Sequence, residues 1–239
     1  MGHPGLSYAL IMLAAIVAAI VLQRRSPRKL PLTGRQRTGV ALGAFCGAML
    51  GAKLPFVLAD WEGLMTGRVW FDNGKTIMFG MVGGYFGVEL AKALLGIRLK
   101  TGDSFAVPVA VAVAIGRVAC FQAGCCFGSE TGLPWGVDFG DGLRRHPTQL
   151  YETAFHLCAA GGLACLQRRG LCRGQLIKLY FLTYFVYRFA TEFIRPETRL
   201  WLGLTGYQWT ALVFIPLFLA LWIHDARRAA EPNRMTGTV

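Results

Sequence analysis

Long apolar runs alternate with short polar segments along the whole chain. Seven of these runs approach the roughly 20 apolar residues that an α-helix needs to cross a bilayer. They cover residues 6–22, 40–58, 76–95, 104–121, 148–166, 176–193 and 207–223. The pattern predicts an all-α integral membrane protein with seven transmembrane helices. We expect one membrane domain over residues 1–239, ending in a disordered tail at 229–239.

The composition is typical of a membrane protein rather than a soluble one. Hydrophobic residues make up 54% of the 239 residues and charged residues only 16%, and the mean hydropathy is +0.44. Soluble domains carry about 25% charged residues. The net charge of +12 alone would suit nucleic acid, but in an apolar chain basic residues mark cytoplasmic loops and contacts with anionic lipid. We therefore expect membrane lipids as partners and no nucleic acid.

The basic residues between the runs predict the orientation, because cytoplasmic loops carry the excess of Lys and Arg. With the N-terminus in the periplasm, fourteen of them fall on the cytoplasmic side and six on the outer side. The cytoplasmic residues are Arg24, Arg25, Arg28, Lys29, Arg35, Arg37, Arg98, Lys100, Arg168, Arg169, Arg173, Arg227, Arg228 and Arg234. The outer residues are Arg68, Lys75, Arg144, Arg145, Arg195 and Arg199. This predicts a periplasmic N-terminus and a cytoplasmic C-terminus.

Arg117, Arg188 and Glu192 lie inside predicted spans, in the halves nearer the periplasm. A charge in the hydrocarbon core costs at least a few kcal/mol, so each of them is a candidate functional residue. Arg188 and Glu192 are four residues apart and share one helix face. The alternative for this pair is an ion pair that joins two helices. For Arg117 the alternative is an interfacial cation that holds a loop or a lipid headgroup.

Three polar stretches meet the predicted periplasmic side. They are residues 116–128 (GRVACFQAGCCFG), 145–152 (RHPTQLYE) and 188–195 (RFATEFIR). The guanidinium forks of Arg117 and Arg188 match a phosphate group. His146 is a candidate general base, because the unperturbed pKa of histidine, about 6.5, suits acid–base work. The alternative is that His146 only caps the helix entry. These stretches therefore predict contact with a phosphate group.

The same stretches resemble those of the prolipoprotein diacylglyceryl transferase family, seven-span enzymes of the bacterial inner membrane. The resemblance rests on GRVACFQAGCCFG, on RHPTQLYE, on YRFATEFIRPE with GYQW soon after it, and on the glycine-rich GMVGGYFGVE of the third run. These motifs extend from about Gly80 to the C-terminus in the family's order. The resemblance implies an enzyme facing the periplasm that moves the diacylglyceryl group of phosphatidylglycerol to a lipobox thiol, with release of glycerol phosphate.

The resemblance also implies roles for single residues. Arg117 corresponds to the family's essential signature arginine, and Arg188 with Glu192 to the pair in the sixth span. The predicted catalytic residues are Arg117, Arg188, Glu192 and, as the base, His146. The predicted substrate-binding residues are Arg145, Gln149, Tyr151, Glu152, Gly83 and Gly84. For the two glycines, close helix packing is the alternative to making room for lipid chains.

Two departures from the family pattern leave other functions open. Val82 stands where the family has a functional histidine, and Cys120 and Cys125 align with its signature asparagine and acid. One alternative is a paralogue that transfers the phosphoglycerol headgroup to another periplasmic acceptor. A second is a non-catalytic phospholipid-binding membrane protein, and a third is a thiol–disulfide protein.

Cys120, Cys125 and Cys126 face the oxidising periplasm in this orientation, so a disulfide is the first expectation. Adjacent cysteines rarely pair with each other, which favours a bond between Cys120 and one of the other two. A reactive thiol is the alternative. We predict no metal, because the sequence lacks a tetrahedral ligand pattern, and no cofactor, because no cofactor motif is visible.

Overall fold

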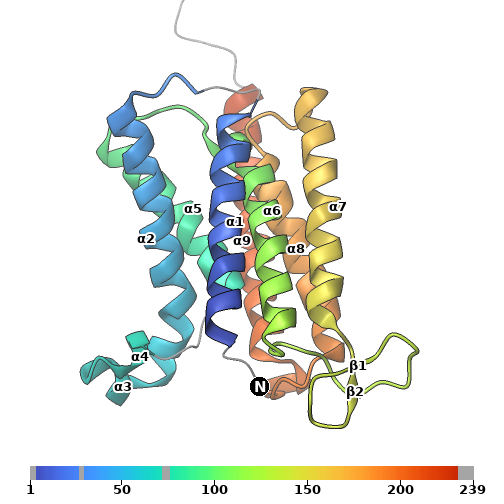
Figure 1. Ribbon diagram of the computed structural model, residues 1–239. Helices are drawn as coiled ribbons and strands as arrows, with labels where there is room; N and C mark the ends of the chain where they lie inside the picture. The colour runs from blue at the N-terminus through green and yellow to red at the C-terminus, as the bar shows by residue number, and fades with distance from the viewer. Residues whose placement is uncertain (1–3, 27–29, 72–75, 231–239) are drawn as a thin grey trace, which may run out of the picture. The chain divides into compact units, whose positions relative to one another are not determined.

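The computed structural model describes residues 4–26, 30–71 and 76–230 and is 74% helix (Figure 1). The chain forms two compact units. Unit 1 contains residues 1–29 and 101–239, and unit 2 contains residues 30–100.

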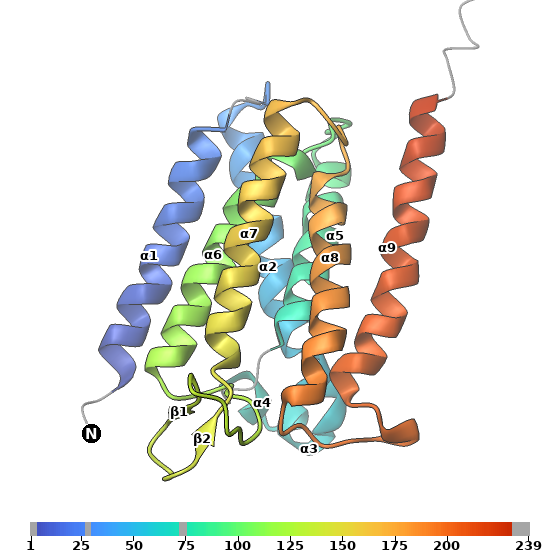
Figure 2. The same ribbon diagram turned by 90° about the vertical axis from the view of Figure 1, so that its right-hand side faces the viewer.

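Unit 1 holds five long helices with a short hairpin and two 3-10 turns in its described residues. The helices are α1 (Pro4–Arg24), α6 (Gly102–Gln122), α7 (Thr148–Arg168), α8 (Leu176–Thr191) and α9 (Gly206–Ala230). The short elements are β1 (Val137–Asp138), β2 (Arg144–Arg145), η1 (Glu192–Ile194) and η2 (Trp201–Gly203). The strands pair antiparallel. Helix α6 packs against both α1 and α7, and α8 packs against α6 and α9 (Figure 2).

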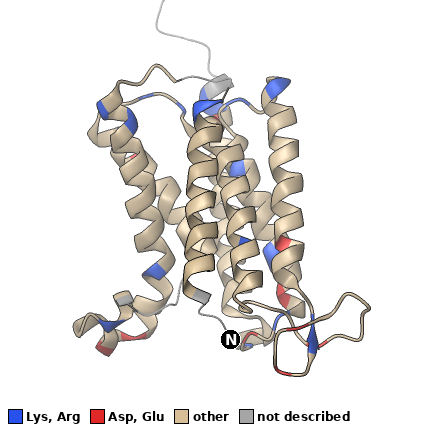
Figure 3. Ribbon diagram, viewed as in Figure 1, with Lys and Arg blue, Asp and Glu red and all other residues tan. Residues whose placement is uncertain are grey.

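The two ends of unit 1 differ in their residues. The hairpin end collects the C-terminal ends of α6 and α8 and the N-terminal ends of α7 and α9 (Figure 2). At the opposite end the last helical turns are basic, as Figure 3 shows for α1 and α7. The last turn of α9 is basic too, with Arg227 and Arg228. Unit 1 therefore has one basic end, while its polar sequence motifs lie at the other.

Asp103 fixes the start of α8 beside α6. Its Oδ2 accepts a hydrogen bond of 2.7 Å from the backbone N–H of Gly174, and its Oδ1 accepts one of 3.1 Å from Leu176. A carboxylate satisfies the free N–H groups at a helix N-terminus and complements the helix dipole. This contact anchors α8, which carries Arg188 in its last turn.

Unit 2 is built on two helices that approach closely. They are α2 (Gly34–Ala59) and α5 (Ile77–Leu94), with the short helices α3 (Trp61–Met65) and α4 (Arg68–Phe71) between them in sequence. A Cβ at Gly47 would lie 2.9 Å from the Cα of Gly87, and a Cβ at Gly51 would lie 2.9 Å from the Cα of Gly83. Small residues allow helix backbones to meet in this way.

Each of the seven predicted runs coincides with a long helix: α1, α2, α5, α6, α7, α8 and α9. Within the described residues, α1, α2, α5, α6 and α9 are long and apolar enough to cross a membrane. The other two carry buried polar residues, including Glu152 and His156 on α7, and α8 has only 16 residues. The count of seven spans therefore stays a prediction.

Some elements have no counterpart in the hydrophobic pattern. The helices α3 and α4 have five and four residues, and each hairpin strand has two, so they are too short to show a period. At the other end of the chain, α9 continues through Ala230. The rest of the predicted disordered tail, 231–239, lies outside the described residues.

Candidate functional site

Glu152 is the centre of a buried polar cluster in unit 1. It lies on one face of α7 with Gln149 and His156, at helical spacings of three and four residues, and all three side chains are at most 1% exposed. A buried carboxylate is costly unless charged partners and hydrogen bonds surround it. The neighbouring elements supply both.

Two guanidinium groups contact the same carboxylate oxygen of Glu152. Arg117 Nε from α6 lies 3.0 Å from Oε2, and Arg195 Nη2 from the segment after η1 lies 3.6 Å from it. Both arginines are less than a tenth exposed. Glu152 thus holds together side chains from two segments that are far apart in sequence. Burial, followed by repulsion from Arg188, lowers the pKa of Arg195 from its ordinary value.

Arg188 and Glu192 form the ion pair that their spacing predicts. Arg188 Nη2 lies 2.9 Å from Glu192 Oε2, and both side chains are buried. Glu192 Oε1 accepts a hydrogen bond of 3.0 Å from the Thr205 hydroxyl. The Arg188 guanidinium lies over the ring of Tyr207, 4.4 Å from its centroid. Both partners of the pair are thereby fixed from the start of α9.

A tyrosine and a histidine complete the surroundings of Glu152. The Tyr184 hydroxyl donates a hydrogen bond of 2.6 Å to Glu152 Oε1. His156 Nε2 lies 3.8 Å from the same oxygen, and its Nδ1 lies 2.9 Å from the Tyr180 hydroxyl. These residues link α7 to α8 through polar contacts inside the helix bundle.

The loop after α6 brings the three predicted cysteines together. Gly124 is left-handed with a φ of 63°, and the N–H groups of Gly124 and Cys125 donate to the carbonyls of Phe121 and Cys120. This is a Schellman motif, which ends a helix by turning the chain back over its last turn. The Sγ atoms of Cys120, Cys125 and Cys126 all lie within 4.8 Å of one another, and the three thiols are free.

Cys126 lies in a polarised environment. Contacts with the thiols of Cys120 and Cys125, and then the charges of Arg117 and Arg195, lower the pKa of the Cys126 thiol from its ordinary value. The Arg117 Nη1 atom is 3.9 Å from Cys120 Sγ. The thiols therefore lie beside the buried arginines, and their closeness is what a disulfide or a shared ligand requires.

His146 belongs to a second group of side chains. Its Nδ1 lies 3.3 Å from the Tyr151 hydroxyl, which accepts a hydrogen bond of 2.7 Å from Trp135 Nε1. Its backbone is fixed to the loop after α6, because its carbonyl accepts from Gly128 and its N–H donates to Ser129. A Cβ at Gly128 would lie 2.7 Å from the Cβ of His146, so this approach requires glycine.

Arg145 stabilises the hairpin in the structure. Its Nε lies 2.8 Å from Asp141 Oδ2, and its guanidinium lies over the Phe127 ring at 5.0 Å. The hydrogen bond from Arg145, followed by one from the Leu143 backbone, lowers the pKa of the Asp141 carboxyl. Gln149 anchors the loop that follows α6 and contains Cys125 and Cys126, called the cysteine loop below. Its Nε2 donates a hydrogen bond of 2.5 Å to the Cys125 carbonyl.

Gly83 and Gly84 lie in unit 2, on the face of α5 that meets α2. A Cβ at Gly83 would lie 2.9 Å from the Cα of Gly51, and one at Gly84 would lie 3.4 Å from the Cβ of Ala48. Close helix packing is therefore observed for both glycines. Their role in substrate binding stays a prediction.

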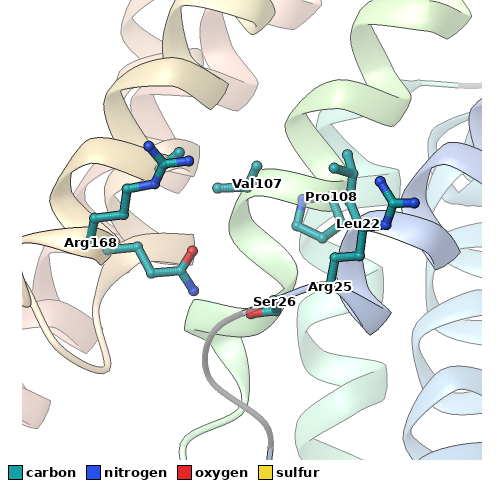
Figure 4. Close-up of a pocket in the computed structure, with 8 residues that line it drawn as sticks. Leu22, Arg25, Ser26, Val107, Pro108 and Arg168 are labelled. Carbon is teal, nitrogen blue, oxygen red and sulfur yellow. The ribbon is translucent and has the colours of Figure 1, made fainter.

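A separate cavity of about 170 Å³ lies at the basic end of unit 1 (Figure 4). Arg25 and Arg168 flank it from opposite sides, and Val107 and Pro108 of α6 lie between them. It contains none of the predicted site residues, so it marks a different place from the polar cluster.

The structure also brings in residues that the sequence did not identify as site residues. Arg195 was expected only as an outer-loop charge, although it belongs to the YRFATEFIRPE motif that could have indicated it. Tyr184 and Thr205 had no signal, because single hydroxyl groups in apolar helices or helix starts are common. His156 was not among the predicted site residues, because its contact with Glu152 depends on the packing of the folded helices.

The arrangement suits an anionic ligand. Three buried guanidinium groups, those of Arg117, Arg188 and Arg195, face two buried carboxylates, those of Glu152 and Glu192. Positive charge in a dry site attracts an anion far more strongly than in water.

The chain is similar to known proteins of one family. A family model described as prolipoprotein diacylglyceryl transferase matches residues 5–224. The chain is 32% identical over 201 residues to the phosphatidylglycerol–prolipoprotein diacylglyceryl transferase of Clostridium tetani, with 80% of each chain covered. It is 33% identical over 198 residues to the protein of that name from Nitratidesulfovibrio vulgaris strain Hildenborough, with 78% of this chain and 74% of the relative covered. For the Geobacter sulfurreducens relative of that name, the identity is 29% over 244 residues, with 89% and 86% covered.

The match spans nearly the whole chain and includes the segments that form the polar cluster. The family resemblance read from the sequence is confirmed. The chain belongs to the prolipoprotein diacylglyceryl transferase family and is a transferase.

Proposed function

We propose that the protein transfers the diacylglyceryl group of phosphatidylglycerol to the thiol of a lipobox cysteine. The names of its relatives, which include both the lipid and the prolipoprotein, support this donor and this acceptor. The products are a thioether-linked diacylglyceryl cysteine and glycerol phosphate.

The observation that carries the proposal is the excess of one guanidinium over the carboxylates in the buried cluster. A phosphodiester carries one negative charge, which matches this excess. Arg117 and Arg188 hold the phosphate, and Glu192 orients Arg188 through their 2.9 Å contact. Negative charge grows on the phosphate as it leaves, so the same guanidinium groups stabilise the transition state more than the ground state.

The chemistry is a substitution at carbon. The acceptor sulfur forms a bond to the terminal glycerol carbon of the diacylglyceryl group, and the bond from that carbon to the phosphate oxygen breaks. The thiol proton passes to His146, since a thiolate rather than a thiol is the nucleophile. In the tautomer in which His146 Nδ1–H donates to the Tyr151 hydroxyl, the Nε2 lone pair is free to accept that proton.

The remaining predicted residues have supporting roles in this proposal. Arg145, Gln149, Tyr151 and Glu152 shape and orient the binding site, whereas Gly83 and Gly84 serve the close packing of α5 against α2 in unit 2. The protein crosses the bacterial inner membrane seven times, with its site toward the periplasm. The basic end of unit 1 opposite the hairpin supports this orientation through the positive-inside rule.

The test compares Arg188→Lys with Arg68→Lys in proteoliposomes that contain phosphatidylglycerol and a lipobox peptide. Lysine keeps the charge but loses the fork that binds phosphate through two donors. We expect Arg188→Lys to lower kcat by about 100-fold or more. Arg68, exposed in unit 2, provides the matched control with activity near the wild-type value. Equal activity of the two folded variants would refute the assignment of Arg188.

A further inference from the structure

Two specific backbone turns define the conformation of the cysteine loop. The Schellman motif returns Cys125 to the last turn of α6, where its Sγ lies 3.5 Å from the Cys120 carbonyl. Cys126 then adopts a left-handed φ of 62°, a conformation that costs a residue with a side chain about 1 kcal/mol or more. The result of these two turns is that three thiols converge.

Side chains from other elements hold this loop by its carbonyls. Gln149 Nε2 donates to the Cys125 carbonyl at 2.5 Å, and the Thr148 hydroxyl donates to the Cys126 carbonyl at 2.8 Å. Arg195 Nη2 donates to the same Cys126 carbonyl at 3.2 Å. Gln149 and Thr148 are buried on α7. Hydrogen bonds to the loop backbone therefore fix the positions of Cys125 and Cys126 without using their sulfur atoms.

The sulfur spacing suits one shared ion. Three thiolates that bind a single ion at about 2.3 Å each have their sulfur atoms roughly 4 Å apart. The observed limit of 4.8 Å needs a movement of less than about 1 Å to reach this arrangement. A disulfide would use two of the sulfurs and would leave the convergence of the third unexplained.

Although the sequence predicted no metal, we propose that Cys120, Cys125 and Cys126 form a binding site for a thiophilic d¹⁰ cation, Zn²⁺ or Cu⁺. Soft thiolate ligands select these ions over Mg²⁺ or Ca²⁺. In the described ranges, no histidine or carboxylate shares the 4.8 Å grouping of the three sulfurs. Three sulfurs complete a trigonal Cu⁺ site, whereas Zn²⁺ would keep a fourth position for water or another thiol.

The surroundings favour deprotonated sulfur. Arg117 Nη1 lies 3.9 Å from Cys120 Sγ, and Arg195 contacts the Cys126 carbonyl. Metal binding requires thiolates and releases their protons, so this environment reduces the cost of binding. This inference does not rest on the proposed transfer reaction, although Arg117 and Gln149 adjoin both sites.

The experiment uses the full-length protein, purified in detergent under anaerobic conditions with reduced thiols. Separate samples receive Zn²⁺ or Cu⁺ and pass through a desalting column before elemental mass spectrometry. We expect about one ion per chain in at least one of the two samples. The variant with Cys120→Ser, Cys125→Ser and Cys126→Ser loses the ion. The matched control carries Cys158→Ser, Cys165→Ser and Cys172→Ser, three exposed positions, and keeps it.

A second variant keeps the proposal testable if the triple variant fails to fold. Gln149→Ala removes the hydrogen bond to the Cys125 carbonyl but leaves all three sulfurs, so we expect metal affinity to fall about 10- to 100-fold. Failure of both ions to bind, or equal binding by the triple variant, would overturn the proposal. A disulfide between two of the three cysteines, found after alkylating intact cells, would overturn it as well.

Discussion

The two units bury different kinds of groups between their helices. In unit 2, α2 and α5 meet through glycines such as Gly47 and Gly83. Its buried lysines contact a backbone carbonyl (Lys53) and a partly exposed carboxylate (Lys92). In unit 1, α6, α7 and α8 enclose Arg117, Glu152 and Arg188. Small residues bring helices together without desolvating a charge, whereas a buried ion pair often stabilises less than apolar residues of the same volume. The charges in unit 1 are therefore better explained by chemistry than by stability.

The largest expected effect on stability comes from Glu152. Glu152→Ala leaves Arg117 and Arg195 without their shared carboxylate inside unit 1. Breaking a buried ion pair in this way costs about 3–5 kcal/mol. In unit 2, Glu89→Ala removes an i,i+3 ion pair with Lys92 in which the Glu89 side chain is 44% exposed. Because this pair is partly solvated, we expect a loss of less than about 1 kcal/mol. Unfolding in detergent micelles measures both, and similar losses would remove the distinction between the units.

The next effect comes from the glycines of unit 2. Gly47→Ala places a Cβ against the backbone of α5, 2.9 Å from the Gly87 Cα, so α2 and α5 must move apart. We expect a loss of about 1–3 kcal/mol. Gly161→Ala is the matched control on α7, because a Cβ there meets nothing within 4 Å, and alanine in a helix gains up to about 1 kcal/mol over glycine. The unfolding midpoints must shift in opposite directions.

A smaller effect is expected for Cys126. A lowered pKa keeps the thiolate present as the pH falls, so metal-free Cys126 reacts with iodoacetamide at pH values where an ordinary thiol does not. Cys172 is the reference, since it is also exposed and has a left-handed φ of 51°. Mass spectrometry of the labelled peptides gives both pH profiles. Superimposable profiles would show that neither the neighbouring thiols nor the arginines lower the pKa of Cys126.

The smallest effect is expected at the hairpin. The Asp141 carboxyl is solvated, and its pKa is lowered by Arg145, so its contribution to stability exists above the unfolded-state pKa and disappears as the pH falls through the folded-state value. Asp141→Asn should shift the unfolding midpoint slightly near neutral pH and not at all in acid. Thermal unfolding at both pH values measures this, and a larger loss in acid would contradict the sign.

The seven long helices could be predicted because apolar runs of that length have few other uses. Arg117, Arg188 and Glu192 stood out for the same reason, since each interrupts an apolar run. Their grouping could not be predicted in full. Arg195 follows the end of α8, where a basic residue looks like an ordinary loop charge, and only the turn at η1 brings it back to Glu152.

Contacts that depend on tertiary folding were invisible in the sequence. His146 stands six residues before Glu152, but the turn into α7 directs it to Tyr151 and the cysteine loop. The convergence of Cys125 and Cys126 with Cys120 depends on two left-handed residues, of which only Gly124 carries a recognisable signal. These features follow from backbone geometry rather than from residue spacing.

The most direct test of the central account follows both halves of the lipid. The purified protein is incubated in vesicles with a lipobox peptide and phosphatidylglycerol that carries one label in its acyl chains and another in its headgroup. The account predicts that the acyl label appears on the peptide cysteine and the headgroup label in soluble glycerol phosphate. Headgroup label on an acceptor, or bound lipid that stays intact, would contradict it.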